Sequence, residues 1–211
     1  WFQSSVAVIF GEMGDKVPEA FRKDREALSG RPFDVQAMKA VAPMMRDQWR
    51  ARLMLLEERL QGGKGAGSGI YLVGMKPGLV DIHAYMNVWF MHQNLPDFVE
   101  TCFKTADLTK AWFERLQEFE GQTPETITSA EALEIGLHAA PRLVAATTRN
   151  EPQEFAPGEN VAVAPDDYGQ VWVEGELVHA DSQRVILQRT SPEAETVHVH
   201  FPRAGFLVRR V

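Results

Sequence analysis

Cysteine, clustered positive charge and long apolar runs are all scarce in this chain of 211 residues. The single cysteine, Cys102, excludes an internal disulfide and any Cys-x-x-Cys redox or zinc motif. No apolar run approaches the roughly 20 residues that a membrane-spanning helix needs. The opening stretch from Trp1 to Phe10 lacks the basic start and small-residue cleavage site of a signal peptide. These absences predict a cytoplasmic protein without a membrane partner.

Basic residues are also outnumbered by acidic ones. The chain has 22 Lys and Arg against 29 Asp and Glu, which gives a formal net charge of -7. Because nucleic-acid binding depends on clustered basic residues that neutralise phosphates, we expect no nucleic-acid partner. The 45% hydrophobic and 24% charged composition is typical of a globular protein with one large domain or two modest ones.

The first two thirds of the chain carry helical spacing. Apolar residues at Phe2, Val6, Ile9 and Met13 already show it, which predicts that the chain begins inside a truncated helix whose upstream part was either removed or is not represented. A long amphipathic helix is predicted over 34–61, with Glu57 among the charged residues that fill the positions between its apolar ones and with a kink at Pro43 or a start just after it. The glycine-dense stretch 62–69 should be a surface loop.

Three further helices are predicted. The segment from Leu79 to Met91 is apolar nearly all round, as in a central buried helix. The pattern repeats over 107–119, and Thr128 with Glu131 forms a capping box for a helix that ends near His138. A stretch around 21–25 is expected to be a loop.

After Pro141 the pattern changes to short, β-branched segments. Strands are predicted at 160–164, 170–173, 184–187 and 196–201, with turns between them that include 174–176. The sequence therefore predicts an α+β fold of several domains. Residues 1–146 form a helical domain, residues 147–157 a linker, and residues 158–211 a small antiparallel β-barrel of SH3-like size.

The segment Tyr71-Leu-Val-Gly-Met-Lys-Pro-Gly-Leu-Val-Asp-Ile-His83, followed by an apolar helix, resembles the glutathione S-transferase superfamily. In the helical C-terminal domain of that family, a capping box and a hydrophobic staple begin the central helix. The match assigns the loop glycine to Gly74, the N-cap to Gly78, the N3 acid to Asp81, and the staple to Pro77 and Ile82. The family has Ser or Thr where this chain has Gly78, so only half of the capping box is retained.

The resemblance implies an all-α glutathione-transferase-like bundle over about Trp1 to Leu143. In the family, a preceding thioredoxin-like domain holds glutathione, the co-substrate, and activates its thiol. This chain shows no βαβ pattern, so no catalytic residue is assigned and no cofactor is expected to bind to it. The resemblance makes Phe2, Ser5 and Ile9 candidates for the wall that contacts a small electrophilic substrate. The alternative is that Phe2 and Ile9 are core residues and Ser5 a surface residue.

Other clusters favour structural explanations. His179, His198 and His200 alternate on predicted strands, but nothing fixes the first beside the pair, so no metal site is expected. Asp166-Asp167 suits a turn, and Cys102 suits a small buried hydrophobe. Asp81 and His83, two residues apart on a helix, do not face each other.

Two functions follow from these observations. The first is a homodimeric transferase-like enzyme in which this chain supplies the substrate side. The second is a non-catalytic scaffold whose β-barrel binds a protein or a small ligand.

Overall fold

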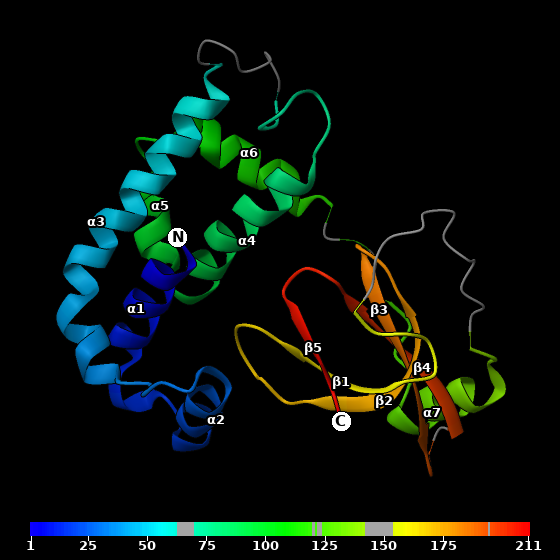
Figure 1. Cartoon of the computed structure of the whole chain (residues 1–211). Coiled ribbons are helices and arrows are strands. Elements are labelled where there is room, and N and C mark those ends of the chain that lie inside the picture. The colour runs from blue at the N-terminus through cyan, green and yellow to red at the C-terminus, as the bar shows by residue number, and fades with distance from the viewer. Residues whose placement is uncertain (63–69, 120, 122–123, 142–153, 194) are drawn as a thin grey trace. The chain divides into compact units, whose positions relative to one another are not determined.

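The computed structural model describes residues 1–62, 70–119, 121, 124–141, 154–193 and 195–211. The chain divides into two compact units, one of residues 1–23 and 32–123, the other of residues 24–31 and 124–211 (Figure 1). The predicted boundary at 146 and most of the predicted linker 147–157 lie outside the described residues. None of the described helices is long and apolar enough to cross a membrane.

Seven α-helices and one short 3-10 turn are described. Their bounds are α1 Phe2–Met13, a 3-10 turn Gly14–Lys16, α2 Glu19–Ser29, α3 Val35–Leu60, α4 Leu79–Asn94, α5 Pro96–Phe103, α6 Asp107–Gln117 and α7 Ser129–His138. The expected loop at 21–25 is wrong, because these residues lie inside α2. The helix α5, which begins with Pro96 in its first turn, was not predicted.

The long helix is confirmed, but it does not begin after Pro43. Asp34 caps it, since the Asp34 carboxylate accepts a hydrogen bond of 2.9 Å from the Ala37 amide. The helix α3 then runs continuously through Pro43 to Leu60. The predicted capping box is also confirmed, with hydrogen bonds in both directions between Thr128 and Glu131.

The helical core forms where α1, α3, α4, α5 and α6 meet. Trp49 and Leu53 of α3, Trp112 of α6 and Met91 of α4 are buried in one cluster. The helices α1 and α3 pack closely at Gly11, where an added Cβ would lie 2.9 Å from the Met38 carbonyl oxygen. Glycine is therefore required at this helix crossing.

Five antiparallel strands form one sheet in the order β4-β3-β2-β1-β5. Their bounds are β1 Asn160–Pro165, β2 Val173–Ala180, β3 Arg184–Ser191, β4 Glu195–Pro202 and β5 Phe206–Arg210. The expected turn at 174–176 is wrong, because these residues lie inside β2. Gly175 is needed there for close packing, since a Cβ would meet the Gln188 carbonyl oxygen of β3 at 2.6 Å.

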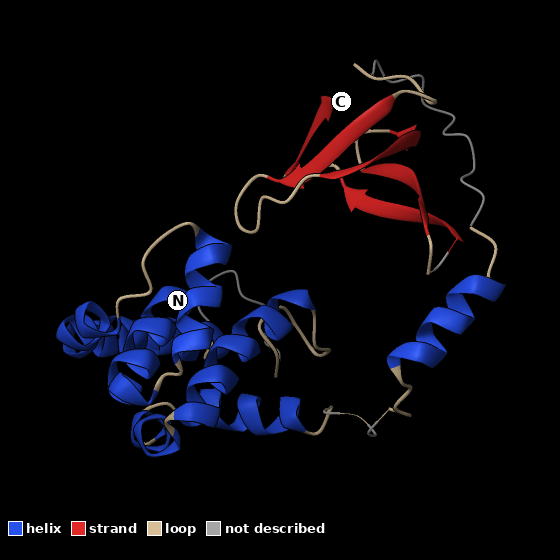
Figure 2. Ribbon diagram, turned by 90° about the horizontal axis from the view of Figure 1, so that it is seen from below, coloured by secondary structure: helices blue, strands red, loops and turns tan. Residues whose placement is uncertain are grey.

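The predicted barrel is not closed, because β4 and β5 are the two edges of the sheet. The sheet is nevertheless strongly curved (Figure 2). Only residues 203–205 join β4 to β5, and such a connection spans at most about 14 Å. The edges of a flat sheet of this width would lie about 19 Å apart. Curvature brings side chains of all the strands into one apolar cluster, which includes Val161, Leu177, Leu187, Phe201 and Phe206.

Candidate functional site

The three side chains predicted to form a substrate wall do not share one exposed surface. Ser5 and Ile9 are fully buried on the inner side of α1, and Ile9 belongs to the helical core. Phe2 is 55% exposed and stacks on Phe90 of α4, with ring centroids 5.9 Å apart. Phe2 also lines a pocket of about 420 Å³ beside Met44, Met45 and Arg52 of α3. Phe2 is therefore the accessible member of the predicted set.

The helix α4 exposes an apolar face, contrary to the expectation of a helix buried all round. Leu79, Ile82, Met86 and Trp89 lie on this face and are 72%, 52%, 46% and 38% exposed. The opposite face carries Asp81, Val88 and Met91, all fully buried. The described helices cover only that second face. The apolar periodicity therefore predicted the helix correctly but did not predict which of its faces is buried. We call Leu79, Ile82, Met86, Trp89 and the neighbouring Phe2 the α4 face.

Asp81 fixes the start of α4 from inside the protein. One carboxylate oxygen, Oδ2, accepts a hydrogen bond of 2.9 Å from the Gly78 amide at the N-cap position. The other, Oδ1, accepts from the Leu72 amide at 2.9 Å and from the Trp112 indole at 2.8 Å. The carboxylate is fully buried, so it joins three segments: the turn before α4, α4 itself and α6. Ile82, the predicted staple residue, is half exposed, and Gly74 adopts a positive φ of 137° in the turn.

A second buried carboxylate, Glu57, holds the start of α6. Its Oε2 accepts from the Thr109 amide and the Thr109 hydroxyl, each at 2.7 Å, and its Oε1 accepts from the Leu108 amide at 3.2 Å. Ala106, at the N-cap of α6, has no side chain able to cap the helix. Glu57 on α3 therefore replaces a local cap. The sequence pattern groups Glu57 with the charged residues between the apolar positions of the helix, but Glu57 is only 4% exposed.

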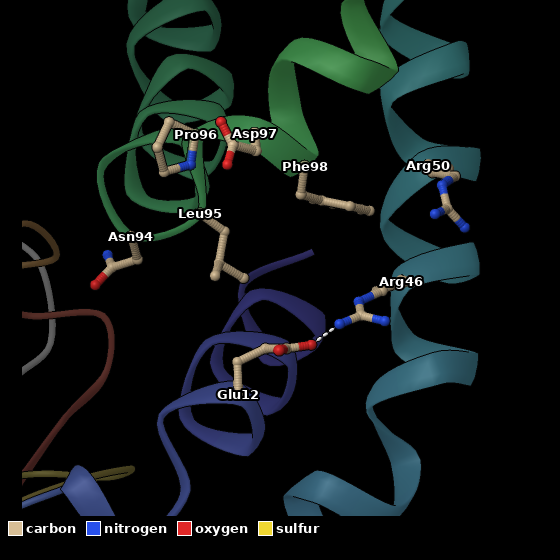
Figure 3. A pocket seen from close by; sticks show the side chains of 8 residues that line it. All are labelled: Glu12, Arg46, Arg50, Asn94, Leu95, Pro96, Asp97 and Phe98. Atoms are coloured by element: carbon tan, nitrogen blue, oxygen red, sulfur yellow. Dashed lines mark ion pairs between the residues drawn. The ribbon is translucent and has the colours of Figure 1, made fainter.

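A pocket of about 390 Å³ lies between α1, α3 and the corner from α4 to α5 (Figure 3). Glu12 of α1 forms an ion pair with Arg46 of α3 in this pocket. Arg50, one turn further along α3, holds its guanidinium 5.1 Å from the centre of the Phe98 ring. Sequence reasoning missed this site, because its residues come from three separate helices and α5 was not predicted.

The other sequence candidates have local structural partners. Burial raises the pKa of the Cys102 thiol, although nearby Arg50 opposes the shift, so Cys102 is not an activated nucleophile. The Asp167 carboxylate accepts from the Tyr168 amide within the loop that follows β1. Among the described residues, no group of three His, Cys, Asp or Glu side chains could hold a metal ion.

His179 contacts Asp181, with its Nε2 atom 2.9 Å from Asp181 Oδ2. This hydrogen bond, together with those from the Gln183 and Arg184 amides, lowers the pKa of Asp181 from 3.8 to about 2 against the opposing effect of burial. A carboxyl group whose pKa is lower in the folded than in the unfolded protein stabilises the fold above its unfolded pKa. That contribution is lost as the pH falls through the folded pKa.

We therefore expect the protection of the β2 and β3 amides from hydrogen exchange to fall between about pH 4 and about pH 2, the pKa of folded Asp181. Asp181→Asn is the matched variant, because Asp181 Oδ1 alone accepts from both backbone amides and an asparagine oxygen keeps those bonds. In this variant the fall in protection should be smaller over the same interval. An identical fall in both proteins would show that Asp181 does not cause it.

Comparison with known proteins finds similarity among solved structures. No protein-family model and no curated protein sequence matches the chain. Among solved structures, a GST-like protein from Pseudomonas syringae is similar, with 31% sequence identity and a TM-score of 0.67. The match covers 79% of this chain and 57% of the Pseudomonas chain, so this chain spans little more than half of that protein. The chain has a GST-like fold.

Proposed function

We propose that this chain is the helical, substrate-side part of a glutathione-transferase-like protein that conjugates or reduces small electrophiles with glutathione. Its GST-like fold and its similarity to a considerably longer GST-like chain support the proposal. Glutathione is then a co-substrate held by an upstream thioredoxin-like domain, which would also supply the residue that activates the thiol. Cytoplasmic location and assembly as a homodimer belong to the same proposal. The exposed Val41, Met44 and Leu55 on one side of α3 provide an apolar surface for a second copy.

The α4 face is the observation that carries this proposal. Large apolar side chains gathered on one rigid helix mark a surface that another structure covers. Asp81 locks the helix that bears them, so the face is preorganised. An upstream domain seated there would bring its glutathione thiol close to Phe2, Phe90 and the accessible end of α1. An electrophile held against these rings would then be positioned for attack by the thiolate.

The test is thiol conjugation of a chromogenic aryl halide by glutathione. The 211-residue chain alone should give no rate above the uncatalysed reaction, because it has no group assigned to activate the thiol. The same chain joined to the sequence encoded upstream of Trp1 should catalyse the reaction. Trp89→Glu should reduce that activity at least about tenfold by placing a charge in an apolar interface. Val171→Glu, at an exposed apolar position next to β2, is the matched control and should retain activity.

Two results would contradict the proposal. One is a folded longer protein that neither binds glutathione nor conjugates the halide. The other is full activity in the Trp89→Glu variant, which would remove the α4 face from the mechanism. The first result would favour the non-catalytic scaffold, and binding partners of the curved sheet would then be the next question.

A further inference from the structure

The pocket in Figure 3 has no part in the proposed function. It lies at the C-terminal end of α4, whereas the α4 face begins at Leu79, and no residue of the α4 face lines it. Its volume of about 390 Å³ suits a small molecule. Basic side chains line one wall, hydrogen-bond acceptors line another, and Leu95 with Phe98 adds apolar surface. We infer that this pocket binds a small zwitterion: an amine and a carboxylate on an apolar body, as in a hydrophobic amino acid.

The basic wall consists of Arg46 and Arg50, which are one turn apart on α3 and therefore point to the same side. Each guanidinium is held at one edge, Arg46 by Glu12 and Arg50 by Asp47 at 2.7 Å. A guanidinium carries five N–H donors in a planar fork, so an ion pair at one edge leaves donors for a second carboxylate. Both side chains are thus oriented before a ligand arrives.

The acceptor wall lies at the corner where α4 ends and α5 begins. The Asp97 carboxylate has no ion pair and no hydrogen bond to any residue that the structure describes. Asn94 donates its amide hydrogen to the Phe90 carbonyl at 2.8 Å, which fixes the side chain and leaves its oxygen free to accept. A ligand ammonium group could donate to the Asp97 carboxylate.

The balance of charge decides the ligand class. A purely anionic ligand would meet Glu12 and Asp97, and a purely cationic one would meet Arg46 and Arg50. A ligand that carries both charges complements both walls. Its apolar part would pack on Phe98, whose ring is already fixed against Arg50.

The inference can be tested by titration calorimetry of the whole chain with L-leucine. Leucinamide, which lacks the carboxylate, and isocaproate, which lacks the amine, are the comparison probes. L-leucine should bind saturably, and each comparison probe should bind about tenfold more weakly. Asp97→Asn should weaken leucine binding about tenfold, whereas isocaproate, which has no amine to lose a partner, should bind no more weakly than before. Arg50→Gln should weaken the binding of both leucine and isocaproate, because both carry the carboxylate.

Asp107→Asn is the matched control for Asp97→Asn, because Asp107 is also an exposed acid in the first turn of a helix but lies outside the pocket. This control should bind leucine as the unmodified chain does. Absence of saturable leucine binding would overturn the inference. Leucine affinity unchanged by Asp97→Asn, or equal affinity for isocaproate and leucine, would also overturn it.

Discussion

Asp81→Ala should lower the free energy of unfolding of the helical unit by about 3–5 kcal/mol. The substitution removes the acceptor for three donors: the Gly78 and Leu72 amides and the Trp112 indole. A buried donor without a partner costs about 1–3 kcal/mol. Because the free energy of unfolding of a whole domain is only about 5–15 kcal/mol, this loss would be a large fraction of it. Urea unfolding followed by tryptophan fluorescence would measure it.

Asp81→Asn separates the geometry of these bonds from the charge. Its remaining oxygen can still accept from Leu72 and Trp112, which share Oδ1, but its amide would face the Gly78 amide with two donors opposed. We therefore expect a smaller loss than for the alanine variant. Asp107→Ala, at the exposed start of α6, should cost no more than about 1 kcal/mol. Similar losses for Asp81→Ala and Asp107→Ala would refute the linking role of Asp81.

Glu57→Ala should destabilise the same unit by about 2–4 kcal/mol. The change leaves the Leu108 and Thr109 amides and the Thr109 hydroxyl without their acceptor, in a place where Ala106 cannot cap the helix. The first turn of α6 should lose order first, because Glu57 is the only cap described for it. Amide hydrogen exchange would show this as faster exchange at residues 108 and 109 than in the rest of α6.

The adjacent residue provides the control for this prediction. Glu58 follows Glu57 on α3 but is exposed, so Glu58→Ala removes the same charge from the same helix. We expect it to change stability by less than about 0.5 kcal/mol. If the two alanine variants unfold at the same urea concentration, the proposed contact between α3 and α6 does not stabilise the protein.

Periodicity and capping residues predicted much of the helical unit. The spacing of Trp49, Leu53 and Leu56 placed α3 correctly, and Asp81 was identified as an N-terminal acid from its short motif. Such signals succeed because helix formation depends on residues three or four apart. They failed at α5, whose eight residues carry too little pattern, and at Glu57, whose partners lie about 50 residues away.

Burial could not be read from the same pattern. Apolar residues at helical spacing predict a helix, but they do not show which of its faces packs against other helices. In α4 both faces carry apolar residues, so the pattern could not distinguish the buried face from the exposed one. In the sheet, Gly175 was mistaken for a turn residue because glycine is common in turns, whereas here it allows β2 and β3 to approach closely. The pocket of Figure 3 was beyond sequence reasoning for a related reason, since only tertiary packing brings Glu12, Arg50 and Asp97 together.

The position of β5 has a consequence for how the sheet resists aggregation. The run Val161-Ala-Val-Ala164 in β1 is wholly apolar and buried, and β5 provides the hydrogen-bonding partner on its outer side. Without β5 this run would become an edge strand with free backbone groups, the kind of segment that pairs with copies of itself. A protease cut or a fusion that detaches residues 206–210 from the sheet would therefore leave β1 as an exposed edge strand that can pair with other copies. The helical unit would remain folded.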